Sequence, residues 1–207
     1  MKKIVEFIVK LSLVGLCIVL LCGCIDKRAP QVSYYSLLSA QQLGTMVGEV
    51  SNPEIKLGIG PITIPDSLKR TQLVTRDEQN IYQFTEYHRW AGVLEKDIAA
   101  VLGDNLGLLT GVDKVAFFPW MHHFSPNYRV IVDITRFDGD LAGEAVLNAR
   151  WSIADAKGAT YLAGGQSVYR QPLESDDYAA LVRAESQLLA ELSREIALEL
   201  QTFLALK

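Results

Sequence analysis

The chain has 207 residues, of which 49% are hydrophobic and 21% are charged, and its formal net charge at neutral pH is −4. This length accommodates one folded domain with additions and excludes a large multidomain enzyme. The charged fraction, with 15 Gly and 7 Pro, also excludes a mostly disordered or collagen-like chain.

The first 23 residues have the layout of a bacterial signal peptide. Lysines flank the start, and residues 11–22 form an apolar run that only Ser12 and Gly15 interrupt. This run is shorter than the roughly 20 apolar residues that a membrane-spanning helix needs. It ends in Leu21-Cys22-Gly23-Cys24, which resembles the lipobox, where a cysteine after a small residue is lipidated. Cys17 and Cys22 both follow leucine, so Cys24 is the predicted lipid acceptor. A secreted protein cleaved elsewhere, or an uncleaved anchor, is the alternative.

Cleavage before Cys24 has consequences for the rest of the chain. Removal of three lysines and one glutamate changes the net charge from −4 to −6. An acidic domain disfavours both nucleic acid and anionic lipid headgroups as broad electrostatic partners, because both would be repelled. Cys24 is then the only cysteine, so no intramolecular disulfide can form. Ile25 follows it instead of the Asp that resembles an inner-membrane retention signal, so we expect the periplasmic face of the outer membrane. The predicted parts are a leader (1–23), a lipidated tether (24–33) and a domain (34–207).

The domain begins with predicted strands. Residues 41–54 are polar and unpatterned, which indicates a loop, and Pro61 favours an edge position or a bulge in its strand. Pro65 can open a single helical turn over 65–68, and the turn at residues 77–80 suggests a hairpin. The last three strands suggest an antiparallel meander, with Asp138-Gly139 breaking the first of them. The expected strands are 34–38, 56–64, 73–76, 81–85, 114–118, 128–137, 145–153 and 161–169.

Two helices are predicted from apolar stripes. The first stripe runs from Trp90 to Leu109 at steps of three and four residues, in a helix that ends near Gly111. The second runs from Tyr178 to Phe203, with Ser175 or Asp176 as its cap and Glu185 as its one polar interruption. The predicted fold class is α/β (α+β). We expect a single domain with a mixed or mostly antiparallel sheet, a central helix and a long C-terminal helix packed on it.

The residues that could carry chemistry form no known catalytic pattern. His88, His122 and His123 are interpreted as surface or satisfied histidines, because metal ligation needs partners at a spacing that is missing here. Gly58-Ile59-Gly60 lacks the third glycine of a dinucleotide fingerprint. Asp133, Asp138 and Asp140 are interpreted as solvated strand and turn residues and not as an acid–base pair. No catalytic residue, metal site or cofactor is therefore predicted.

The aromatic segment Phe117-Phe118-Pro119-Trp120-Met121 allows two interpretations. Its rings can fill the core at the end of a strand, since large apolar residues are most often buried. Alternatively, Phe118, Pro119, Trp120 and Met121 form an exposed anchor for another protein, because aromatic residues and Met are enriched in interface cores.

Several motifs together resemble one family. The family is PqiC/YmbA, the auxiliary lipoproteins of ABC-type transport systems, and the order and spacing of the motifs cover most of the mature chain. They are Tyr34-Tyr35-Ser36-Leu37, Leu57-Gly58-Ile59-Gly60-Pro61-Ile62-Thr63-Ile64-Pro65 with Leu68, Arg70 and Leu73-Val74-Thr75-Arg76, Arg89-Trp90-Ala91 with Leu94, Pro119-Trp120, and Arg136-Phe137-Asp138-Gly139 with Leu147 and Trp151.

This resemblance implies a non-enzymatic component of an intermembrane phospholipid transport system. Its expected partners are an MCE-domain protein and the inner-membrane permease of that system. The resemblance also implies docking of the MCE tube at the outer membrane and a possible homo-oligomeric ring. Two alternatives remain: a lipoprotein hydrolase of envelope lipid or peptidoglycan, which would need a nucleophile beside a histidine, and a free-standing envelope scaffold.

Overall fold

The computed structural model describes residues 2–5, 7, 30–45, 54–77, 79–121 and 123–205. The chain divides into two units, residues 1–31 and 32–207, and each is considered by itself. In the first unit, residues 2–5 and 7 are helical and exposed, while Cys24 and most of the predicted leader lie outside the described residues. No helix within the described ranges is both long and apolar enough to cross a membrane. The second unit contains the sheet and the two long helices.

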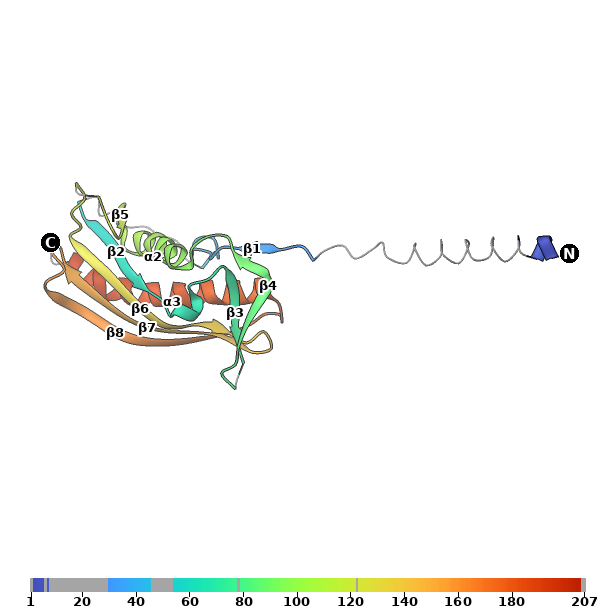
Figure 1. Cartoon of the computed structure of the whole chain (residues 1–207). Coiled ribbons are helices and arrows are strands. Elements are labelled where there is room, and N and C mark those ends of the chain that lie inside the picture. The colour runs from blue at the N-terminus through green and yellow to red at the C-terminus, as the bar shows by residue number, and fades with distance from the viewer. Residues whose placement is uncertain are drawn as a thin grey trace. The chain divides into compact units, whose positions relative to one another are not determined.

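Within the described part of the chain, an open sheet of eight strands forms the framework of this domain (Figure 1). In chain order the strands are β1 (Ser33–Tyr35), β2 (Lys56–Thr63), β3 (Gln72–Arg76), β4 (Tyr82–Trp90), β5 (Lys114–Phe117), β6 (Tyr128–Gly139), β7 (Glu144–Asp155) and β8 (Tyr161–Pro172). The meander β6-β7-β8 and the hairpin β3-β4 are antiparallel, whereas β2 pairs in parallel with β5 and β6, and β1 with β4. The predicted mixed sheet is therefore confirmed.

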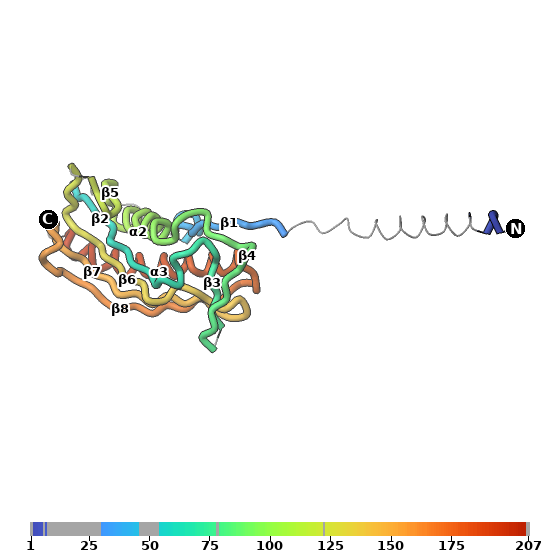
Figure 2. Tube along the Cα trace, in the orientation of Figure 1, coloured from blue at the N-terminus to red at the C-terminus, as the bar shows by residue number. Residues whose placement is uncertain are grey.

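The two long helices pack against each other and against the sheet. Helix α2 (Leu94–Thr110) contacts β2 and β5, and helix α3 (Tyr178–Leu204) contacts β7 and β8. Gly111 ends α2 in the left-handed conformation, at φ 67°, which glycine adopts without steric cost. A single 3-10 turn, η2 (Asp66–Leu68), lies where Pro65 predicts one. The long ribbon of α3 runs behind the sheet in Figures 1 and 2.

Four predictions about the secondary structure need correction. Trp90 ends β4 instead of starting the helix, because β1 pairs with β4 as far as Trp90. Pro61 lies in an interior strand, next to a register shift between Ile59 and Ile62, so the bulge interpretation holds and the edge interpretation does not. Asp177, and not Ser175 or Asp176, caps α3, and its carboxylate accepts a hydrogen bond from the Ala180 N–H at 2.8 Å.

The fourth correction concerns Asp138-Gly139, which lies inside β6 and does not break it. A Cβ on Gly139 would lie 2.8 Å from the Glu144 carbonyl oxygen and 2.8 Å from Leu181 Cδ1. The missing side chain thus lets β7 and α3 approach β6 closely, so this glycine serves packing and not a turn.

Polar contacts join the segment after β1 to both helices. The Leu37 N–H donates to the Asp97 carboxylate at 3.0 Å, and the Leu38 N–H donates to the Ser186 hydroxyl at 3.0 Å. The Ala40 N–H donates to the buried Asn105 side chain at 2.7 Å. The segment that follows the predicted tether is therefore attached to a rigid part of the domain.

Candidate functional site

The aromatic segment forms a loop directly after β5, at the end of the domain opposite β1 (Figures 1 and 2). Phe118, Pro119 and Met121 are exposed, and Trp120 is half-buried. The Phe118 N–H donates to the Ile59 carbonyl oxygen at 2.8 Å, which holds the start of the loop against β2. The interpretation in which all these rings fill the core is therefore wrong for the exposed members, and partner binding by them stays a prediction.

Trp120 contacts two neighbouring side chains, Phe118 and Arg129. Its ring meets that of Phe118 edge to face, with ring centroids 5.3 Å apart, and the Arg129 guanidinium lies 5.0 Å from the indole centroid. An edge-to-face pair and a cation over a ring are both favourable contacts between aromatic and charged groups. They hold Phe118 in its exposed position.

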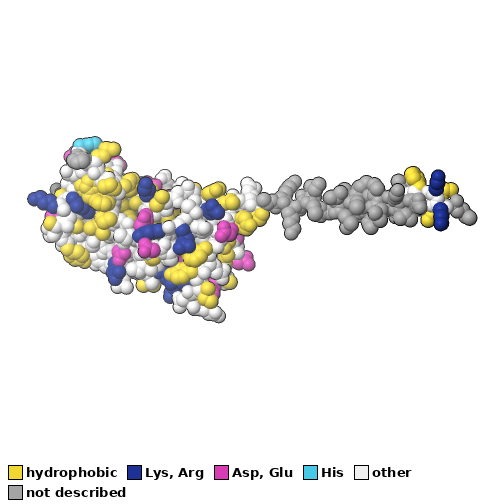
Figure 3. Space-filling model, in the orientation of Figure 1, with side chains coloured by type: hydrophobic (Ala, Val, Ile, Leu, Met, Phe, Trp, Pro, Cys, Tyr) yellow, Lys and Arg dark blue, Asp and Glu magenta, His cyan; other side chains and the backbone are white. Residues whose placement is uncertain are grey.

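An apolar hollow of about 620 Å³ lies beside the loop, between β2 and α2. The loop contributes Phe117, Phe118 and Pro119 to its lining, the β2 bulge contributes Pro61, and α2 contributes Ala99 among other residues. Glu95 and Lys96 supply the charged part of the lining. In Figure 3, hydrophobic side chains gather over this part of the domain. The loop and hollow together form what we call the loop surface: Phe118, Pro119, Met121, Pro61 and Ala99.

The hollow was not predicted from the sequence. Its walls come from segments that are separated by tens of residues, and only the bulge brings Pro61 beside the loop. Gly103, a glycine inside the helix, is one local signal of this close packing. A Cβ on Gly103 would lie 2.7 Å from Phe117 Cε1, so the Phe117 ring occupies the space of the missing side chain. This contact holds β5 close to α2.

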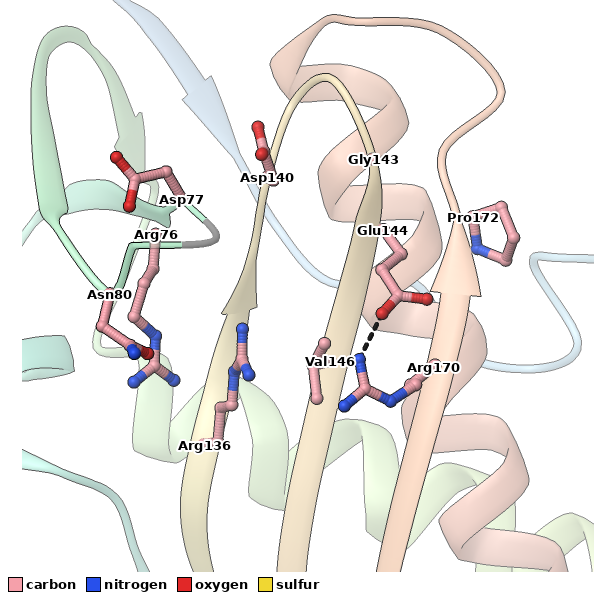
Figure 4. Close-up of a pocket in the computed structure, with 10 residues that line it drawn as sticks. All are labelled: Arg76, Asp77, Asn80, Arg136, Asp140, Gly143, Glu144, Val146, Arg170 and Pro172. Carbon is pink, nitrogen blue, oxygen red and sulfur yellow. Dashed lines mark hydrogen bonds and ion pairs between the residues drawn. The ribbon is translucent and has the colours of Figure 1, made fainter.

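A second hollow, of about 550 Å³, is lined by polar side chains from four strands (Figure 4). Arg76 of β3, Arg136 of β6 and Arg170 of β8 lie side by side, and Arg170 pairs with Glu144 of β7. Arg76 and Arg136 both bind the carboxylate of Asp138, at 2.8 Å and 2.9 Å. The arginines thus have acidic partners, and the cluster mainly links β3, β6, β7 and β8.

Asp138 is the residue of this cluster whose exposure was wrongly predicted from the sequence. It is 2% exposed, so its interpretation as a solvated strand residue is wrong. Asp133 and Asp140 are not buried: Asp133 binds Thr63 and Arg150, and Asp140 accepts a bond from the Ala142 N–H in the turn between β6 and β7.

Glu185 of α3 lies close to this cluster and is fully buried. Burial raises the pKa of its carboxyl well above the ordinary value, and the negative charge of Asp138 raises it further. One of its oxygens, Oε2, has no hydrogen-bond partner among the described residues. Burial thus favours the protonated form of Glu185 over its charged form.

The histidines are placed in different surroundings. The His88 Nδ1 atom lies 2.8 Å from the Tyr35 hydroxyl, and its ring stacks on Tyr178 of α3 at 4.1 Å. His123 is exposed, and His122 lies outside the described residues. Within the ranges that the structure describes, no group of three or more His, Cys, Asp or Glu side chains could hold a metal ion.

One comparison with known proteins identifies a family. Residues 35–197 match the family model described as ABC-type transport auxiliary lipoprotein component. A comparison with curated protein sequences gives no match. The family match confirms the resemblance that the motifs indicate.

Two solved structures share the fold. A crystal structure of an uncharacterized protein is 22% identical, with a TM-score of 0.66, and the match covers 82% of this chain and 99% of that chain. Protein XCC0632 from Xanthomonas campestris, of family DUF330, is 16% identical, with a TM-score of 0.63, over 80% of this chain and 93% of that chain. At these identities the two structures establish the fold only.

Proposed function

The chain belongs to the family of ABC-type transport auxiliary lipoprotein components, and on that premise we propose that it is a non-enzymatic docking component of an MCE-type intermembrane phospholipid transport system. Acyl chains on Cys24 anchor it to the outer membrane, facing the periplasm. The domain receives the MCE-domain protein, whose inner-membrane permease belongs to the same system. Several copies can surround the MCE tube as a ring.

One observation carries the docking part of this proposal. The loop surface presents exposed Phe118, Pro119 and Met121 beside an apolar hollow, at the end of the domain opposite β1, the strand that follows the tether. Exposed aromatic and Met side chains next to a hollow are typical of the anchors that dominate protein interfaces. A protein that links a membrane to a transport tube needs a docking surface away from its point of attachment, and the separation of the loop surface from β1 within the domain supports this.

Photo-crosslinking in the native membrane tests this docking surface. A photoreactive amino acid replaces Met121, which is 70% exposed, and a matched control replaces Val168 of β8, which is 55% exposed. We expect an adduct with the MCE-domain protein from position 121 and none from position 168. If neither position yields this adduct in cells that contain the intact lipoprotein, docking through the loop surface is wrong.

The anchor is tested separately. Cys24→Ala is expected to remove the lipid and to shift the protein out of the outer-membrane fraction, since several acyl chains hold a protein far more firmly than one. Mass spectrometry of the mature N-terminus measures the lipid directly. An unchanged outer-membrane pool of the variant would contradict the anchor.

A further inference from the structure

A second group of exposed apolar side chains lies on the β3-β4 hairpin and on β1. We call this group the hairpin surface and define it as Tyr34, Ile81, Tyr82, Phe84 and Tyr87. Tyr34 lies opposite Arg89 in the parallel pairing of β1 with β4. Arg89 also pairs with Gln72 of β3, and Phe84 pairs with Val74. Since residues two apart in a strand share a face, Tyr34 and Phe84 lie on the same side of the sheet. Yellow side chains with neighbouring dark-blue ones are visible on the hairpin in Figure 3.

Arginines accompany the rings of this surface. The rings of Tyr82 and Phe84 stack with an interplanar angle of 2°, at 6.3 Å between centroids. The Arg70 guanidinium lies 3.9 Å from the Phe84 centroid, and that of Arg76 lies 5.0 Å from the Tyr82 centroid. Amphipathic rings accompanied by long basic side chains are typical of protein surfaces at the headgroup level of a membrane.

The short length of the predicted tether keeps this surface near lipid. The nine residues from Ile25 to Ser33 span at most about 30 Å. They end at Ser33, which pairs with His88 of β4. Phe84 lies four residues from His88 along β4, which corresponds to about 13 Å at the rise per residue of a strand. The bonds of Leu37, Leu38 and Ala40 hold the segment after β1 on the helices. The rings thus lie well within the reach of the tether.

We propose that the hairpin surface rests on the phospholipid membrane that carries the anchor, with its rings in the headgroup region, an inference that depends on the anchor part of the proposed function. Lipid is favoured over a protein partner because the tether confines this end of the domain to the membrane. The nearby charges are largely paired, Arg76 with Asp138 and Arg89 with Glu86. Ring insertion, and not net positive charge, therefore drives the contact, which should persist at high salt.

An environment-sensitive fluorophore on a single cysteine tests the contact. The mature chain has no free thiol once Cys24 is lipidated, so Phe84→Cys or Tyr87→Cys supplies the only labelling site. Leu198→Cys on α3 is the control, because residue 198 is 66% exposed and lies outside the hairpin. The full mature lipoprotein is reconstituted in vesicles of phosphatidylethanolamine and phosphatidylglycerol.

We expect the emission at positions 84 and 87 to be several-fold brighter than at position 198, and to be quenched by lipids that carry a spin label at the headgroup. Equal emission at all three positions would overturn the inference. If the emission at positions 84 and 87 rises with the protein density in the vesicles and does not depend on lipid, the surface contacts a second copy of the chain. This result would also overturn the inference. Labelling of the unsubstituted chain would show that Cys24 is free, which overturns the anchor itself and the inference with it.

Discussion

Gly58 of β2 leaves the space that the indole ring of Trp120 occupies. A Cβ on Gly58 would lie 2.9 Å from Trp120 Cζ3 and 3.0 Å from Pro126 Cβ. Real Cβ atoms essentially never come as close as 2.9 Å to another heavy atom, so Trp120 would have to move if residue 58 carried a side chain. The position of the whole loop surface thus depends on a residue more than sixty positions earlier in the chain.

Gly58→Ala is expected to displace Trp120 and to lower the free energy of unfolding by about 1–3 kcal/mol, the usual cost of overpacking. Chemical denaturation measures the loss, and the crosslinking yield at position 121 measures the effect on docking. Gly92→Ala is the matched control, because a Cβ at that position would have no atom within 4 Å. Equal stability of the two variants would contradict the packing role of Gly58.

Asp138→Asn is expected to destabilise the domain by about 3 kcal/mol, because it leaves the partly buried Arg76 and Arg136 without their shared carboxylate. Asp133→Asn breaks an exposed pair with Arg150 and is expected to cost about 0–1 kcal/mol. Denaturant midpoints of the two variants provide the comparison. A cost for Asp138→Asn no larger than that for Asp133→Asn would refute the structural role of the arginine cluster.

Glu185→Gln is expected to stabilise the domain at neutral pH. Because the pKa of Glu185 is raised in the folded state, its proton is retained there while the unfolded chain ionises. The free energy of unfolding of the parent therefore falls as the pH rises from about 4.3, the ordinary pKa, up to the raised value. Gln cannot ionise, so the free energy of unfolding of the variant does not fall with pH in this way.

The pH dependence of unfolding for Glu185→Gln and the parent measures this effect. Their stabilities should differ least below about pH 4.3 and diverge above it, in favour of the variant. Glu199→Gln, on the exposed side of α3, should follow the parent at every pH. Parallel curves for the parent and Glu185→Gln would show that Glu185 is not held protonated.

Tyr169→Phe is expected to lower the free energy of unfolding by about 1.5–3 kcal/mol, the range for a hydrogen bond to a charged group. The Tyr169 and Ser167 hydroxyls both donate to the Glu195 carboxylate at 2.5 Å, which joins β8 to α3. Burial, followed by the bond to Glu195, raises the pKa of Tyr169, so its hydroxyl remains a donor. Tyr161→Phe, at an exposed position of β8, is the control and should change nothing in thermal unfolding.

Much of the secondary structure could be predicted from local patterns. Strand alternation located β6, β7 and β8, and the three-and-four spacing located α2 and α3, because each pattern involves residues close in sequence. The Asp138-Gly139 pair shows where local reasoning stops. Asp and Gly are residue types that favour a turn, yet the close approach of β7 and Leu181 keeps this pair in a strand.

The resemblance to the family also came from the sequence, and the family match over residues 35–197 confirms it. The leader, the lipid on Cys24 and partner binding by Phe118 to Met121 remain predictions. What the sequence determined by itself is thus the elements, the mixed sheet with two long helices, and the family.

Only the tertiary structure decided which of these residues are exposed and which are brought together. The hollow beside Pro61, the arginine cluster around Asp138 and the aromatic hairpin next to β1 each join segments that are far apart in the chain. Exposure and proximity of this kind depend on strand pairing and on close packing at glycines. Both are long-range properties, and the periodicity of a single segment does not record them.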